Sequence, residues 1–152
     1  MAELHELTAL ECESLLRSHN VGRVAVSTPT GPHIIPLNYS VIEGKNVIIV
    51  RTSPYSVLGT YGRDTTLALQ IDGFDHDREL GWSVQARGRA SVVEDCAEIA
   101  HIHQGRHTPP WAGGSRSQYM RLPWNELTGR RLGSGWSPVA RPEPQGKVRD
   151  SV

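Results

Sequence analysis

The sequence contains little that would mark a secreted, membrane-spanning or metal-binding protein. Its 152 residues include only two cysteines, Cys12 and Cys96, and their spacing matches no metal or redox motif. We therefore expect two reduced thiols in a cytoplasmic protein, with a disulfide between them as the less favoured alternative. No apolar run approaches the roughly 20 residues that cross a bilayer, and residues 1–6 lack the apolar core of a secretory signal.

An excess of charge of one sign is also missing. Sixteen Lys and Arg residues balance sixteen Asp and Glu residues, so there is no basic stripe of the kind that binds nucleic acid. The glycine fingerprints of dinucleotide-binding and phosphate-binding loops do not occur. His101, His103 and His107 have no Cys or carboxylate to complete a metal site, which favours a solvated cluster. The sequence thus predicts no metal, nucleic-acid or membrane partner, and no catalytic residue can be named.

What the sequence does contain is a series of short strand patterns separated by turn residues. The predicted strands cover residues 21–26, 33–41, 47–50, 67–71, 82–93 and 119–122, with residues 127–132 as a continuation of the last one. Pro and Gly at residues 28–32, and Gly and Asn at residues 43–46, favour tight turns between neighbouring strands. About six short strands joined in this way predict a mainly β protein, an antiparallel barrel or sandwich.

Three short helices are predicted between these strands. Thr8 and Glu11 have the spacing of a capping box at the start of a helix that reaches Ser18. Ser53 could cap a second helix that begins at Pro54 and ends near residues 61–62, and Asp95 a third that ends near residue 104. We expect one domain over residues 1–132, followed by an extended or disordered tail, residues 133–152, rich in Pro, Gly and charge.

Several pieces of the sequence, in this order, resemble the pyridoxamine 5'-phosphate oxidase-like family, the FMN-binding split barrels. They span roughly residues 7–132, and their order and spacing carry the resemblance. The pieces are Val21-Gly22-Arg23-Val24-Ala25, Gly31-Pro32-His33-Ile34-Ile35-Pro36-Leu37-Asn38-Tyr39, Val47-Ile48-Ile49-Val50-Arg51-Thr52, Leu69-Gln70-Ile71-Asp72, Gly81-Trp82-Ser83-Val84-Gln85-Ala86-Arg87-Gly88-Arg89-Ala90 and Gly129-Arg130-Arg131. The resemblance implies an antiparallel split β-barrel of Greek-key type that forms a homodimer.

The resemblance also implies where a flavin would bind. The backbone of the second strand would lie along the flavin ring, and the corner after the next strand would hold the phosphate. The partner subunit would contribute further cofactor contacts from a later strand. The cofactor-binding residues expected in this way are Ile35, Pro36, Leu37, Asn38, Arg51, Thr52, Ser53, Ser56, Trp82 and Ser83. Residue chemistry independently supports the corner, because a guanidinium, two hydroxyls and the N–H groups of a starting helix all suit a phosphate.

Some of these residues also have simpler explanations. Trp82 is explained at least as well as a core or dimer-interface aromatic, and His33, which could reach the phosphate, as a surface histidine. Pro36 favours an edge strand or a bulge, because it has no N–H to donate to a neighbour. Arg87 and Arg89 would share one face of a strand, which favours a solvated or interface surface over a second anion contact.

One position departs from the family pattern. Many members carry a lysine in the first turn of the helix after the phosphate corner, where this chain has Val57. Loss of one ammonium weakens phosphate binding by about 1–3 kcal/mol. The phosphate could be held by Arg51 alone or by Arg63, or the cofactor could differ: FMN is favoured, while FAD and the deazaflavin coenzyme stay open.

We therefore predict a flavin-dependent oxidoreductase that acts on a small organic molecule, with its cofactor at a dimer interface. The alternative is a non-enzymatic module that binds a flavin, haem or another anion on the same barrel. A purely structural domain is a weaker third reading. Oxidation of pyridoxamine 5'-phosphate itself is not favoured, because the contacts that its phosphate needs cannot be located in this short chain.

Overall fold

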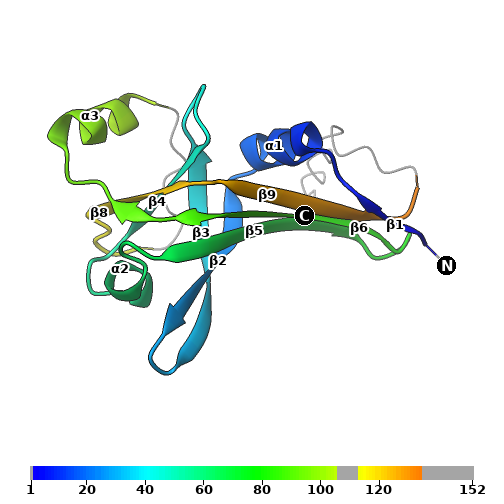
Figure 1. Ribbon diagram of the computed structural model, residues 1–152, viewed down its shortest axis with the longest axis horizontal. Helices are drawn as coiled ribbons and strands as arrows, with labels where there is room; N and C mark the ends of the chain where they lie inside the picture. Colours follow the sequence, from blue (N-terminus) through cyan, green and yellow to red (C-terminus); the bar gives the residue numbers. More distant parts are fainter. Residues whose placement is uncertain (1, 106–112, 135–152) are drawn as a thin grey trace, which may run out of the picture.

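One antiparallel sheet of nine strands organises residues 2–105 and 113–134, which are the residues that the computed structural model describes (Figure 1). The strands are β1 (Leu4–Glu6), β2 (Val21–Thr28), β3 (Gly31–Val41), β4 (Val47–Thr52), β5 (Thr66–Asp75), β6 (Leu80–Arg89), β7 (Ser91–Val92), β8 (Gln118–Pro123) and β9 (Glu126–Leu132). They lie in the order β1-β9-β6-β5-β2-β3-β4-β8-β7. The predicted mainly β, antiparallel fold is confirmed, whereas the split barrel and the homodimer stay predictions.

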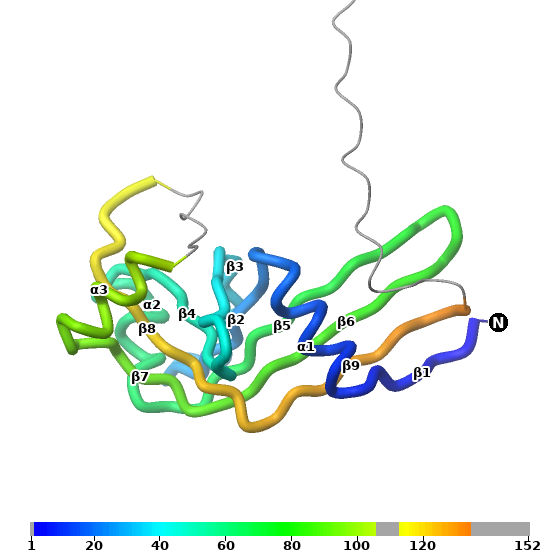
Figure 2. The backbone as a smooth tube through the Cα atoms, turned by 90° about the horizontal axis from the view of Figure 1, so that it is seen from above, coloured from blue at the N-terminus to red at the C-terminus, as the bar shows by residue number. Residues whose placement is uncertain are grey.

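The first and third helices begin where the sequence predicts. In α1 (Ala9–Ser18) the Thr8 hydroxyl accepts from the Glu11 amide at 3.2 Å, and the Glu11 carboxylate accepts from the Thr8 amide at 2.8 Å. In α3 (Cys96–Gln104) the Asp95 carboxylate accepts from the amides of Ala97 and Glu98, both at 3.3 Å. Helix α3 lies at one end of the sheet, whereas α1 lies over its middle, beside β9 (Figures 1 and 2).

The second helix begins later than predicted. Residues 54–55 form a turn, and α2 (Val57–Tyr61) starts after Ser56, whose hydroxyl accepts from the Gly59 amide at 3.0 Å. The predicted cap at Ser53 is wrong, because the Ser53 hydroxyl accepts instead from the Tyr55 amide at 3.3 Å, within the turn. With five residues, α2 is too short to offer the anion-binding helix start expected at Pro54.

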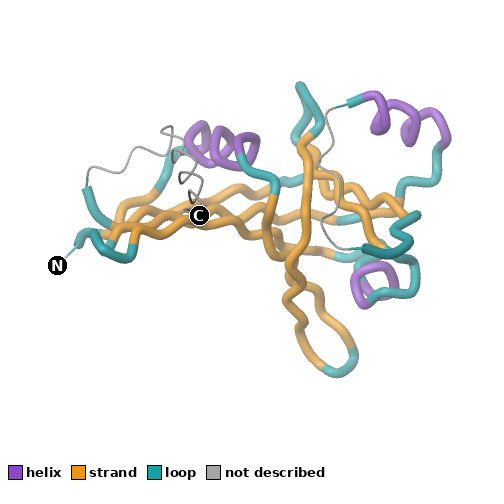
Figure 3. The backbone as a smooth tube through the Cα atoms, turned by 180° about the vertical axis from the view of Figure 1, so that it is seen from behind, coloured by secondary structure: helices purple, strands orange, loops and turns teal. Residues whose placement is uncertain are grey.

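Strand β3 is shared between two parts of the sheet. Residues 31–38 pair with β2, whereas only residues 39–41 pair with β4. The β2–β3 hairpin therefore projects from the rest of the sheet (Figure 3). The edge of residues 31–38 that faces away from β2 therefore has no neighbouring strand among the described residues. Tyr39 donates its amide to the Asn20 carbonyl, on the β2 side, so strand alternation turns the Pro36 nitrogen toward the open edge. Of the edge and the bulge that Pro36 favours, the structure shows a locally open edge.

The core is packed between this sheet and α1. Cys12, Leu15 and Leu16 of α1 are buried, and a Cβ at Gly129 of β9 would lie 2.7 Å from the Cys12 sulfur, so the glycine permits the helix to dock. Burial raises the pKa of the Cys12 thiol. Cys96 is exposed on α3, well apart from α1, and both thiols are free, which excludes the disulfide alternative (Figure 1).

Most of the predicted tail, from residue 135 to residue 152, lies outside the described residues. In the part of the chain that the structure describes, no helix is long and apolar enough to cross a membrane.

Close approach of β6 to the turn before β9 provides a test of the fold. A Cβ added at Gly88 would lie 1.9 Å from the carbonyl oxygen of Pro123, which is main chain and cannot turn aside. We expect Gly88→Ala to lower the free energy of unfolding by about 2–3 kcal/mol, measured by urea denaturation. Gly113→Ala is the matched control, since a Cβ there meets nothing within 4 Å; equal denaturation midpoints would contradict the packing described.

Candidate functional site

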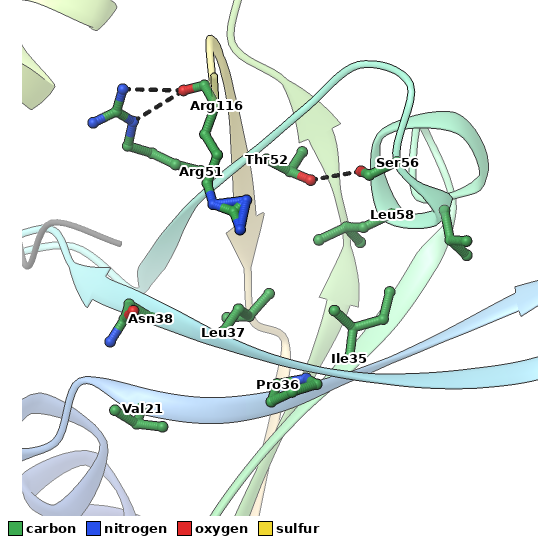
Figure 4. Close-up of a pocket in the computed structure, with 11 residues that line it drawn as sticks. Val21, Ile35, Pro36, Leu37, Asn38, Arg51, Thr52, Ser56, Leu58 and Arg116 are labelled. Atoms are coloured by element: carbon green, nitrogen blue, oxygen red, sulfur yellow. Dashed lines mark hydrogen bonds between the residues drawn. The ribbon is translucent and has the colours of Figure 1, made fainter. Parts of the chain in front are cut away.

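A cavity of about 460 Å³ lies between the open edge of β3, the end of β4 and α2 (Figure 4). Its volume is within the range of roughly 300–1,000 Å³ that is usual for small-molecule sites. The lining residues come from elements far apart in the sequence; they are Val21, Ile35, Pro36, Leu37, Asn38, Arg51, Thr52, Ser56, Val57, Leu58 and Arg116.

One side of the cavity is apolar. Ile35 and Leu37 alternate along β3 and also pack against the core, while Leu58 of α2 is buried. Val21, at the start of β2 and paired with Asn38, extends this surface. Such a surface suits a flat, apolar ligand ring.

The opposite corner is polar and internally braced. Thr52 is only 7% exposed, and its hydroxyl lies 2.7 Å from that of Ser56. The Ser56 hydroxyl donates to the Ser53 carbonyl at 2.7 Å and accepts from the Gly59 amide. Because Ser56 has one hydroxyl proton, the Thr52 hydroxyl is the donor between the two. Both protons are thus used within the protein, and the two hydroxyls shape the corner.

Two arginines make the cavity cationic. The Arg51 guanidinium donates from Nε and Nη2 to the Arg116 carbonyl, at 3.3 and 3.0 Å, and lies 5.0 Å from the centre of the Tyr119 ring. The guanidinium of Arg116 points into the cavity (Figure 4). None of the described lining residues is acidic, so the site favours an anionic ligand.

The structure brings together seven of the ten residues predicted from the sequence and leaves three apart. Those that line the cavity are Ile35, Pro36, Leu37, Asn38, Arg51, Thr52 and Ser56. Ser53 supports the corner through its carbonyl. Trp82 is 6% exposed, and its ring lies 4.9 Å from that of His19, which agrees with a core aromatic. That Trp82 and Ser83 reach a partner's cofactor stays a prediction.

Other sequence-based alternatives lie outside this cavity. Arg63 is exposed, and its guanidinium lies 3.8 Å from the Glu94 carboxylate, away from the lining. His33 is exposed in the β2–β3 hairpin and is also absent from the lining. Arg87 pairs with Glu126 at 3.0 Å across β6 and β9, which fits a solvated face.

The predicted histidine cluster is only partly described. His103 lies 3.3 Å from the Tyr119 hydroxyl, and His107 falls outside the described residues. Within residues 2–105 and 113–134, no three His, Cys, Asp or Glu side chains gather in a way that could hold a metal ion.

Sequence reasoning missed Val21, Leu58 and Arg116. Val21 and Leu58 read as ordinary core residues, and Arg116 lies in a polar loop that has no pattern of its own. The pairing of Thr52 with Gln118 in the β4–β8 ladder would have placed Arg116 near the corner, but that pairing joins segments 66 residues apart.

Comparison with known proteins identifies the family to which the chain belongs. The family model of pyridoxamine 5'-phosphate oxidase matches residues 8–131. The chain belongs to this family. This match confirms the resemblance seen in the sequence. The matched residues include β2 to β8 and all of β9 except its last residue.

Individual proteins are similar to this chain over most of their length. The uncharacterized protein Rv0080 of Mycobacterium tuberculosis is 30% identical over 133 residues, which is 86% of each chain. The structure of an FAD-binding protein from Mycobacterium smegmatis has 29% identity and a TM-score of 0.70, covering 84% of this chain and 97% of that one. A Corynebacterium glutamicum protein, provisionally assigned as a pyridoxamine 5'-phosphate oxidase, has 27% identity and a TM-score of 0.72, covering 88% and 96%.

The braced corner provides a second test. Ser56→Ala removes the cap of α2 and the partner of Thr52, so we expect the free energy of unfolding to fall by about 1 kcal/mol. Ser53→Ala removes a hydroxyl that accepts only from Tyr55 among the described residues, and should cost clearly less. Thermal and urea unfolding of both variants would check this; a larger loss in Ser53→Ala would contradict the assignment of the cap.

Proposed function

We propose that this chain is a flavin-dependent oxidoreductase that acts on a small organic molecule, with FMN as the favoured cofactor. The observation that carries the proposal is the cavity itself, which joins an apolar surface to a cationic corner. A flavin has complementary parts, with a flat ring system at one end and an anionic phosphate toward the other. The relative described as an FAD-binding protein supports a flavin of some kind.

The residues present fit such a group. Ile35, Leu37 and Leu58 would pack against the ring, and the arginine-bearing corner beside Thr52 would hold the phosphate. When bound, the flavin supplies the transfer of hydride or electrons, and the protein positions the ring and tunes its surroundings. The described lining agrees with this role of the protein, because it contains no His, Cys, Asp or Glu for acid–base or nucleophilic chemistry.

We also propose that the cofactor lies at the interface of a homodimer. Pro36 is exposed, and Val57 is 37% exposed although it lines the cavity. A ligand packed on this surface would therefore be covered by one chain on one side only. A second subunit would complete the enclosure, and Trp82 and Ser83 are the residues we expect near that interface.

A non-enzymatic binding module is the second candidate function. Val57 favours it, because the first turn of α2 faces the cavity without the positive charge that many family members place there. Stopped-flow reduction of the flavin-loaded protein by NADPH separates the two candidates. Rapid reduction followed by reoxidation with an organic acceptor supports the oxidoreductase, whereas a flavin that stays oxidised supports the module.

The proposed site can be tested through the wall of the cavity. We expect purified protein to bind FMN or FAD, seen in the visible spectrum and identified by mass spectrometry of the released cofactor. Leu37→Glu puts a charged carboxylate where the apolar ring would pack and lowers the positive charge of the cavity, so it should weaken binding by about 100-fold or more.

Ile34→Glu is the matched control, because Ile34 lies on the same strand, is 71% exposed and does not line the cavity. Circular dichroism would verify that both variants are folded. Wild-type protein that binds no flavin, or equal losses in the two variants, would contradict the site.

A further inference from the structure

We propose that Arg116 binds the phosphate of the flavin directly, and that Arg51 is a positioning residue that holds Arg116 in place. This inference rests on the proposed flavin-binding function and names the group that recognises the anionic end of the ligand. It reverses the expectation from the sequence, in which Arg51 makes the phosphate contact.

Arg116 has the placement that a phosphate-binding side chain needs. It is half-buried, lines the cavity, and directs its guanidinium into it, toward the space between Leu37 and Thr52 (Figure 4). Among the described residues, the Arg116 side chain has no hydrogen bond or ion pair. A partly desolvated guanidinium without a partner is costly, and a bound phosphate would relieve that cost through paired, charge-assisted hydrogen bonds.

Arg51, in contrast, is already engaged by the protein. Two of its nitrogens donate to the carbonyl of Arg116, and its guanidinium lies over the Tyr119 ring. In Figure 4 the Arg51 guanidinium is turned toward the Arg116 carbonyl, whereas the Arg116 guanidinium points toward Leu37. Arg51 therefore fixes the main chain from which the Arg116 side chain projects, at a point two residues before β8.

This arrangement also accounts for Val57. The chain lacks a cation in the first turn of α2, but Arg116 brings one into the same cavity from a different segment. Pairing of Thr52 with Gln118 holds the two segments together at this end of the β4–β8 ladder. The charge missing from the helix is thus supplied from the loop before β8.

The test compares FMN with riboflavin, which has the same ring but no phosphate. Fluorescence titration should show that Arg116→Gln weakens FMN binding by about 10- to 100-fold and leaves riboflavin affinity unchanged. Arg116→Lys should restore part of the loss, and Arg63→Gln, outside the cavity, should change neither ligand.

Arg51→Gln should also weaken FMN binding, and the double variant Arg51→Gln/Arg116→Gln should bind FMN as Arg116→Gln does, because the first residue acts through the second. An Arg116→Gln variant that keeps wild-type FMN affinity, or that loses both ligands equally, would overturn the role of Arg116. Additive losses in the double variant would overturn the positioning role of Arg51. Wild-type protein that binds neither ligand would overturn the proposed function itself and this inference with it.

Discussion

Strand β3 pairs with β2 along residues 31–38 but with β4 only along residues 39–41, and the edge left open by this difference forms one wall of the cavity. Pro36 suits that edge because it has no N–H to leave unpaired. The change of partner also separates β4 from the start of β3, which makes room for α2 and the loop before β8. The cavity thus follows from how one long strand is shared.

Electrostatics then gives the cavity its chemical preference. Two arginines and no acidic side chain line the described part of it. The Thr52 hydroxyl, which the sequence offers to a phosphate, donates to Ser56 instead, and the Ser56 hydroxyl donates to the Ser53 carbonyl. Polar groups near a ligand site therefore divide into those that shape the main chain and those that face the ligand, and residue type alone does not distinguish the two.

Much of the fold was predictable because its signals are local. The Thr8 capping box, the hairpin at residues 43–46 and the alternation of residues 67–71 each depend on neighbours in the sequence, and each appears in the structure. The start of α2 was not predicted correctly, since two serines compete to cap it and a turn at residues 54–55 selects Ser56. Where two residues could cap the same helix, tertiary contacts decide which of them does so.

Most of the strands, the family and most of the cavity wall could be predicted from the sequence, because alternation, turn residues and ordered motifs act over short distances. The separation of β9 from β8 could not, because it depends on the pairing of β9 with β6. Which of the two lining arginines directs its guanidinium to the ligand space depends on tertiary contacts. Arg51 follows a recognisable strand, but its guanidinium is drawn to the carbonyl of residue 116 by a pairing between β4 and β8. Arg116 carries no local signal, and its position exists only once those two strands have met.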